Sequence, residues 1–266
     1  MNETLTRALS GVLYIIILVS ATLFSNSFLV LFGLLLLLSV YEFCELVNLD
    51  KRFPFILALS CYFFCAYYTG NSTIDFILLV LFLLTATKAF LFLFNTKEKV
   101  ISLPEKFFFL FGYVIIPFIL LAKLPFIETR FNPKVVIGLF ILIWFNDTMA
   151  YVVGKSVGKT KLFKSVSPKK TIEGFLGGLF FSALISIFIA VYYINEPIFR
   201  WIIIALIVGV FGTLGDLIES KFKRTAGVKD SGKIMPGHGG ILDRLDSIIF
   251  AGPFVFLFYQ IVNYVS

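Results

Sequence analysis

Acidic, basic and glycine residues gather in one segment of the sequence, residues 215–247. If residues 214–224 form a helix, four polar residues share one of its faces, because residues three and four apart lie one above the other. These four are Asp216, Glu219, Ser220 and Lys223. If another helix begins near Ile241, Asp243 and Asp246 also share a face. Two helix ends would then present carboxylates to one mouth, and hard oxygen ligands of this kind suit Mg²⁺.

Cations and glycines alternate with these acids. Five of the segment's cations, Lys223, Arg224, Lys229, Lys233 and Arg244, are interspersed among the acids. The turn at 236–240 reads Pro-Gly-His-Gly-Gly, ahead of the second expected helix. Glycines let backbone N–H groups approach an anion, and a helix N-terminus favours negative charge. Together these features favour a site for a nucleoside triphosphate or pyrophosphate. The alternative is a salt-bridged cap that only ties two helices together.

Other polar residues in apolar surroundings extend the candidate site. Asn146 and Asp147 lie inside an apolar run, where a polar pair indicates either function or helix–helix hydrogen bonding. Lys169 and Lys170 precede another expected helix, with Ser167 as its candidate N-cap, and can meet phosphate or merely mark the helix start. Glu42 and Glu45, at the end of a second apolar run, are expected at the membrane interface.

The composition excludes a soluble enzyme. The chain has 266 residues, of which 59% are hydrophobic and 15% charged, and its mean hydropathy is +0.97. An ordinary soluble domain is about 45–50% apolar and about 25% charged. The three cysteines lie in apolar runs without a CxxC pair, which excludes a disulfide scaffold. An integral membrane protein remains.

Apolar runs of about 20 residues predict an all-α polytopic membrane protein with nine spans. No period-two alternation supports a β-barrel. The chain reads as one membrane domain, 1–266, with generic spans in 1–134 and a catalytic part in 135–266 that carries loops 154–174 and 220–245. The predicted spans are 8–24, 27–47, 53–70, 73–94, 107–122, 135–153, 175–194, 198–219 and 246–265.

The distribution of cations predicts the orientation of these spans. With nine spans, 18 of the 23 Lys and Arg residues fall on the side of the N-terminus and only four on the other. The positive-inside rule therefore places the N-terminus in the cytoplasm and the C-terminus outside. The alternative for the basic loops is that their charges set topology and contact anionic lipid, without a catalytic role.

The motif of the C-terminal half closely resembles that of the phosphatidate cytidylyltransferases, also called CDP-diacylglycerol synthases. The resemblance covers about residues 135–250; Met235 departs from it, at a position where Ile, Leu or Phe is expected. Asn146-Asp147, the segment 167–174 and Gly215-Asp216-Leu217 also resemble the family. The main motif reads Ser220-x-Phe222-Lys223-Arg224, then Lys229-Asp230-x-Gly232, then Pro236-x-His238-Gly239-Gly240-x-x-Asp243-Arg244-x-Asp246.

The resemblance implies a reaction and its site. CTP and phosphatidate would give CDP-diacylglycerol and pyrophosphate, with Mg²⁺, in many members a monovalent cation such as K⁺, and a membrane homodimer. The site would face the cytoplasm from a bacterial-type inner membrane, and no nucleic acid is expected as a partner. Asp216, Asp243 and Asp246 would bind metal, and Lys223 and Asp243 would be catalytic. The substrate-binding residues would be Asn146, Asp147, Lys169, Lys170, Ser220, Arg224, Lys229, His238 and Arg244.

Three other functions compete with this reading. A CTP-dependent lipid kinase needs a similar nucleotide site, but its products would be a phospholipid and CDP. A transporter of anionic solutes would suit Asp147 and the basic loops. A CDP-alcohol phosphotransferase fits less well, because the sequence has no run of paired aspartates of the DGxxAR type.

Overall fold

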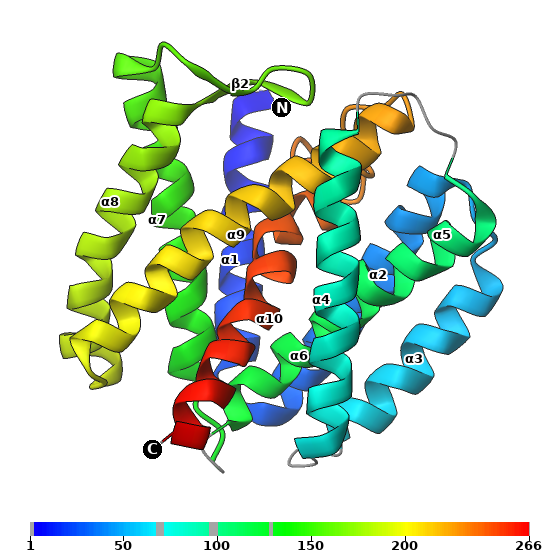
Figure 1. Ribbon diagram of the computed structural model, residues 1–266, viewed down its shortest axis with the longest axis horizontal. Coiled ribbons are helices and arrows are strands. Elements are labelled where there is room, and N and C mark those ends of the chain that lie inside the picture. Colours follow the sequence, from blue (N-terminus) through cyan, green and yellow to red (C-terminus); the bar gives the residue numbers. More distant parts are fainter. Residues whose placement is uncertain (1–2, 68–71, 96–100, 128–129, 266) are drawn as a thin grey trace.

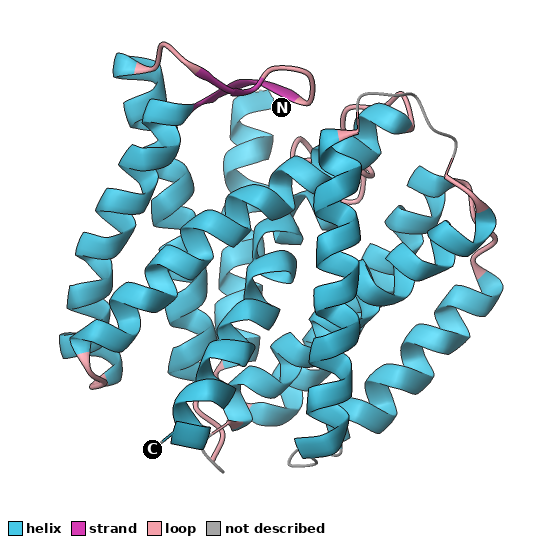
Figure 2. Ribbon diagram, in the orientation of Figure 1, coloured by secondary structure: helices cyan, strands magenta, loops and turns pink. Residues whose placement is uncertain are grey.

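A bundle of long helices forms almost the entire computed structural model, which describes residues 3–67, 72–95, 101–127 and 130–265 (Figures 1 and 2). Nine helical segments of these described parts match the nine predicted runs. They are α1 (Glu3–Thr22), α2 (Ser25–Val47), α3 (Arg52–Tyr67), α4 (Ser72–Phe94), the composite segment Leu103–Phe126, α7 (Pro133–Val157), α8 (Ile172–Phe188) continued by the π-helix η3 (Ile189–Ile194), α9 (Ile198–Thr225) and α10 (Leu242–Val265).

Seven of these segments are long and apolar enough to cross a membrane. The other two apolar stretches, Leu9–Thr22 in α1 and Arg52–Ala66 in α3, are shorter than these seven. The all-α membrane class is therefore confirmed for the described residues, whereas the count of nine spans stays a prediction.

The segment Leu103–Phe126 forms the centre of the bundle. It consists of α5 (Leu103–Phe109), the π-helix η1 (Leu110–Ile115), α6 (Ile116–Lys123) and the 3₁₀ turn η2 (Leu124–Phe126). Pro117 at the start of α6 has no N–H to donate inside a helix, and the wider turn of η1 just before it accommodates this. In its most apolar stretch of 18 residues, 83% of the residues are buried, a larger share than in any other of the seven long apolar segments.

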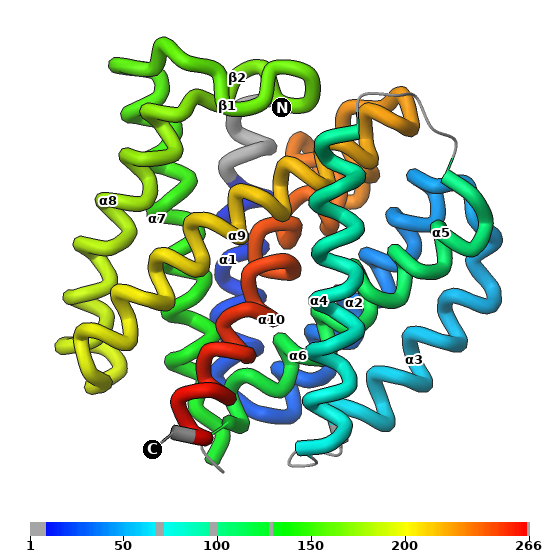
Figure 3. Tube along the Cα trace, in the orientation of Figure 1, coloured from blue at the N-terminus to red at the C-terminus, as the bar shows by residue number. Residues whose placement is uncertain are grey.

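Helix α8 lies at the periphery instead. Its residues Leu176, Phe180, Leu184 and Phe188 follow one another at intervals of four and are all exposed. Such a stripe of large apolar side chains would be unfavourable in water, but it matches hydrocarbon. The opposite side of α8 packs on α7 and α9, and α9 packs along α10 (Figure 3).

The segment between α7 and α8 departs from the all-helical expectation. It contains an antiparallel hairpin of β1 (Lys161–Phe163) and β2 (Ser167–Thr171). Thr171 caps α8, because its Oγ1 accepts the N–H of Gly174 at 3.1 Å; the expected cap, Ser167, lies in β2 instead. Glu173 accepts the backbone N–H groups of Lys159 and Thr160, which ties the hairpin to the start of α8.

The start of α1, the hairpin and residues 226–241 lie at one end of the molecule, and the C-terminus lies at the other (Figure 1). We call the end that carries the hairpin and residues 226–241 the basic end. Because α9 arrives at the basic end and α10 departs from it, the last turns of α9 and the first turns of α10 meet there.

Candidate active site

The last turns of α9 bring the four predicted polar residues onto one face. Lys223 forms an ion pair with Glu219 one turn before it, and the Glu219 side chain is fully buried. Ser220 Oγ donates a hydrogen bond to Asp216 Oδ1 at 3.2 Å. The helical spacing from which the sequence predicted this face is confirmed.

The first turn of α10 is joined to this face by Asp243. Its Oδ1 lies 2.5 Å from Lys223 Nζ, and the two side chains are 7% and 10% exposed. Its Oδ2 accepts the backbone N–H groups of Ser231 at 2.9 Å and Gly240 at 2.8 Å. Asp243 therefore connects α9, α10 and two points, Ser231 and Gly240, of the segment between them.

The hairpin contributes a second ion pair. Lys170 Nζ, on β2, lies 2.5 Å from Asp216 Oδ2, and each side chain is about 30% exposed. Burial by itself lowers the pKa of Lys170, but the neighbouring Asp216 carboxylate outweighs it, so the pKa is raised above its ordinary value. Lys170 therefore stays charged at neutral pH. The adjacent Lys169 is exposed.

Asp246 and Asp147 complete the charged group. Asp246 lies one helical turn after Asp243 and within electrostatic reach of Asp216, Lys223, Lys170 and Asp147. Asn146 is buried, and its Nδ2 donates to Asp147 Oδ1 at 3.4 Å. The oxygen Oδ1 of Asn146 is buried without a hydrogen-bond partner, which leaves one acceptor for a ligand or water.

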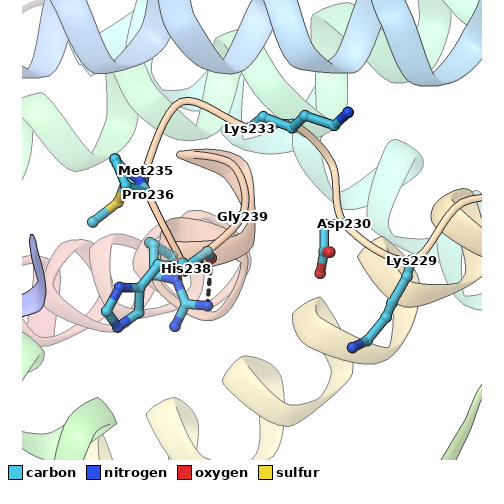
Figure 4. Close-up of a pocket in the computed structure, with 10 residues that line it drawn as sticks. Lys229, Asp230, Lys233, Met235, Pro236, His238 and Gly239 are labelled. Atoms are coloured by element: carbon cyan, nitrogen blue, oxygen red, sulfur yellow. Dashed lines mark hydrogen bonds between the residues drawn. The ribbon is translucent and has the colours of Figure 1, made fainter. Parts of the chain in front are cut away.

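A cavity of about 420 Å³ opens beside this group, between residues 229–239 and Arg244 (Figure 4). Lys229 and Asp230 lie on one side of it, and Pro236 and His238 on the other. Arg244 donates from Nε and Nη2 to the His238 carbonyl at 3.1 and 2.7 Å. Gly237 and Gly239 have φ values of 76° and 85°, which other residues rarely adopt.

A profile of the Cytidylyltransferase family matches residues 5–262 of this sequence. The chain belongs to this family.

Relatives within the family carry a more specific name. The chain is 53% identical over 116 residues to a protein named phosphatidate cytidylyltransferase of Staphylococcus aureus (strain COL), which covers 43% of this chain and 44% of the relative. It is 45% identical over 130 residues to one of the same name of Staphylococcus epidermidis, covering 48% of this chain and 50% of that relative. The matched segments thus span about half the length of these relatives.

Most of the predicted substrate-binding residues fall into two places. Lys170, Ser220, Asn146 and Asp147 surround the α9–α10 junction. Lys229, His238 and Arg244 line the 420 Å³ cavity. Arg224 lies apart from that cavity: its Nη1 donates to the Val228 carbonyl at 2.9 Å, and it lines a larger cavity of about 1430 Å³ that shares Lys229 with the first.

The carboxylates at the junction fit Mg²⁺ only in part. Within the described ranges, no three Asp, Glu, His or Cys side chains lie together closely enough for a complete protein-only metal site. Mg²⁺ usually takes one or two protein carboxylates and completes its shell with water and substrate phosphate. The mutually repelling Asp216 and Asp246 fit that pattern. Both oxygens of Asp243 are already engaged, so ligation by Asp243 stays a prediction that requires it to leave Lys223.

Three residues of the N-terminal half reach this site, and sequence reasoning missed them. Ser10 Oγ lies 2.9 Å from His238 Nδ1. The Tyr14 hydroxyl, one turn later on α1, lies within electrostatic reach of Arg244 and Asp246 and is buried without a hydrogen-bond partner among the described residues. Glu42 was expected at the interface, but it is 1% exposed and is hydrogen-bonded to the segment before α10. The only signal for Glu42 was an acid within an apolar span, a feature that often indicates function.

Proposed function

We propose that this protein is a phosphatidate cytidylyltransferase, which transfers CMP from CTP to phosphatidate and gives CDP-diacylglycerol and pyrophosphate. The observation that carries the proposal is the α9–α10 junction, where Lys170, Lys223, Asp216 and Asp243 meet beside a basic cavity. Family membership and the name shared by the relatives support the same reaction.

The reaction needs no nucleophilic side chain. A phosphate oxygen of phosphatidate attacks the α-phosphorus of CTP, a new P–O bond forms, and the bond to the β-phosphate breaks with its electron pair leaving on pyrophosphate. The protein must hold two polyanions together and offset the charge that develops. That is positioning and electrostatic stabilisation, the usual contributions of a protein to phosphoryl-type transfer.

The cations can be given roles from their contacts. An ammonium has three donor hydrogens, and Lys223 uses two of them on Glu219 and Asp243, so the third is available to a phosphate oxygen. Lys170 brings a second ammonium from the hairpin. Lys229 and Arg244 line the cavity that would take the nucleotide phosphates, and Ser220 and His238 would hydrogen-bond substrate. Asn146, Asp147, Lys169 and Arg224 would border the rest of the pocket.

Mg²⁺ belongs to the proposal as a cofactor held by Asp216 and Asp246, with Asp243 as the third predicted ligand. When bound, it would neutralise part of the charge on the phosphates. Assistance by K⁺ and assembly as a homodimer, which the family resemblance implies, stay predictions.

Product analysis tests the proposal. Purified protein in detergent receives labelled CTP, phosphatidate and Mg²⁺, and the expected products are CDP-diacylglycerol and pyrophosphate in equal amounts. A phosphorylated lipid with free CDP would instead indicate a lipid kinase. Because detergent solution has no compartments, a pure transporter would give no product at all, and either result would contradict the proposal.

We further propose that all nine helical segments cross a bacterial inner membrane and that the basic end faces the cytoplasm, where CTP is available. A reporter fused after Ser266 should then report the outer side. Lys161→Cys, on the exposed hairpin, should resist a membrane-impermeant maleimide in intact cells and react after lysis, with the unsubstituted chain as the background. A cytoplasmic reporter signal would contradict the odd number of spans, and labelling of Lys161→Cys in intact cells would contradict the orientation.

A further inference from the structure

Glu42 is a buried acid from the half of the chain that lies outside the recognised motif. It lies on α2, and its carboxylate accepts three hydrogen bonds from residues about 200 positions later. Oε1 accepts the N–H of Ile241 at 2.9 Å, and Oε2 accepts the N–H of Leu242 at 2.8 Å and the hydroxyl of Ser231 at 3.1 Å. Within the described residues, Glu42 forms no ion pair with a Lys, Arg or His side chain.

The surroundings of Glu42 are built for a carboxylate. Ile241 and Leu242 stand at the start of α10, where unpaired N–H groups and the helix dipole favour negative charge. A Cβ on Gly232 or on Gly240 would overlap the Glu42 carboxylate oxygens. The two glycines therefore leave the space that this carboxylate occupies. This need for space explains glycine at both positions, although neither has a positive φ.

The two ends of one segment converge on this carboxylate. We call residues 231–241 the 231–241 loop. Glu42 holds its first residue through the Ser231 hydroxyl and its last residue through the N–H of Ile241. Asp243 holds the Ser231 and Gly240 N–H groups from the other side. Between these anchors the loop carries Lys233 and His238 to the wall of the 420 Å³ cavity.

We propose that Glu42 is a positioning residue for the nucleotide: it closes the 231–241 loop so that the cavity presents its cations and N–H groups to the CTP phosphates. This inference rests on the proposed function. A loop whose ends are held before the ligand arrives loses less conformational freedom on binding, so holding the loop closed raises the affinity for CTP. Phosphatidate enters from the membrane and does not need this loop, so the two substrates should respond differently.

The test compares Glu42→Gln with Glu45→Gln in the purified full-length protein. Glutamine keeps the shape of Glu42 but turns an NH₂ group toward one of the donors. Glu45 lies three residues later on α2 and is about half exposed. It borders the 1430 Å³ cavity, but its carboxylate pairs with Lys51 and not with the backbone of the loop. We expect Glu42→Gln to raise the KM for CTP about tenfold to a hundredfold and to leave the KM for phosphatidate within about twofold. Glu45→Gln should leave both constants unchanged.

Two further variants address a purely structural role. Ser231→Ala removes a single hydrogen bond to the same carboxylate and should raise the KM for CTP a few-fold, even if Glu42→Gln fails to fold. Glu42→Asp keeps the charge and should recover part of the CTP affinity relative to Glu42→Gln. Equal changes in both KM values, or an unchanged KM for CTP in Ser231→Ala, would overturn the inference.

Direct binding separates this inference from the proposed function. CTP should raise the unfolding temperature of the unsubstituted protein and of Glu45→Gln, but much less that of Glu42→Gln. If the unsubstituted protein is stabilised by CTP without forming CDP-diacylglycerol, the proposed reaction fails while the role of Glu42 is still measured. If CTP stabilises Glu42→Gln as strongly as the unsubstituted protein, or stabilises neither of them, the role of Glu42 is overturned.

Discussion

Lys223→Met should cost about 3–5 kcal/mol of unfolding free energy, the usual loss when one partner of a buried ion pair is removed. The ammonium lies between Glu219 and Asp243, and all three side chains are at most 10% exposed. Its removal leaves two carboxylates facing each other without a cation. Turnover should fall at least about a hundredfold, because the same ammonium is proposed to donate a hydrogen bond to a substrate phosphate oxygen. Thermal unfolding in detergent and steady-state kinetics measure the two effects.

A double variant separates the two effects of this lysine. Glu219→Gln removes one of the two opposed charges, so Lys223→Met/Glu219→Gln should regain part of the lost stability but none of the activity. Lys164 is an exposed lysine of the hairpin turn at the same end. Lys164→Met makes the same charge change and should alter neither the unfolding free energy nor the turnover. Unchanged kinetics in Lys223→Met would exclude Lys223 from the site, and recovered activity in the double variant would reduce its role to packing.

The sequence predicts the α9–α10 junction well because its information is local. Asp216, Ser220 and Lys223 are separated by three or four residues, and a helix of any origin places them on one face. The start of α10 near Ile241 is likewise a local signal, because a glycine-rich turn precedes an apolar run. The ion pair between Lys223 and Asp243 follows once these two helix ends meet.

The hairpin between α7 and α8 could not be predicted in the same way. Its strands are three and five residues long, and β2 reads Ser-Pro-Lys-Lys-Thr, without an apolar alternation. What stabilises the hairpin is Glu173, which accepts N–H groups 13 and 14 residues earlier in the chain. Only this tertiary arrangement shows that Lys170, and not Lys169, reaches Asp216.

Glu42 shows a different limit of sequence reasoning. Its span indicates only that an acid lies near the end of an apolar helix, which fits an interfacial residue equally well. Its three hydrogen bonds cross about 200 residues of chain, and no local pattern encodes such a contact. The glycines at 232 and 240 do carry a signal, but without the structure they read as phosphate-loop glycines.

Asp216→Asn should reduce turnover at least about a hundredfold while the protein remains folded. The ion pair of Asp216 with Lys170 is about 30% exposed on both sides, and exposed pairs of this kind add little to stability. The loss should therefore come from the proposed metal site. Binding of Mn²⁺ in the presence of CTP, followed by electron paramagnetic resonance, should weaken about tenfold to a hundredfold.

Two comparisons decide what the loss means. Asp50→Asn, an exposed aspartate outside the junction, should keep both the activity and the Mn²⁺ affinity of the unsubstituted protein. Lys170→Met removes the other half of the ion pair but none of the proposed ligands, so it should lower turnover and leave Mn²⁺ binding within about threefold. If Asp216→Asn binds Mn²⁺ normally, Asp216 acts through Lys170 alone. The carboxylates of Asp246 and Asp243 would then have to hold the metal without it, and for Asp243 that means releasing Lys223.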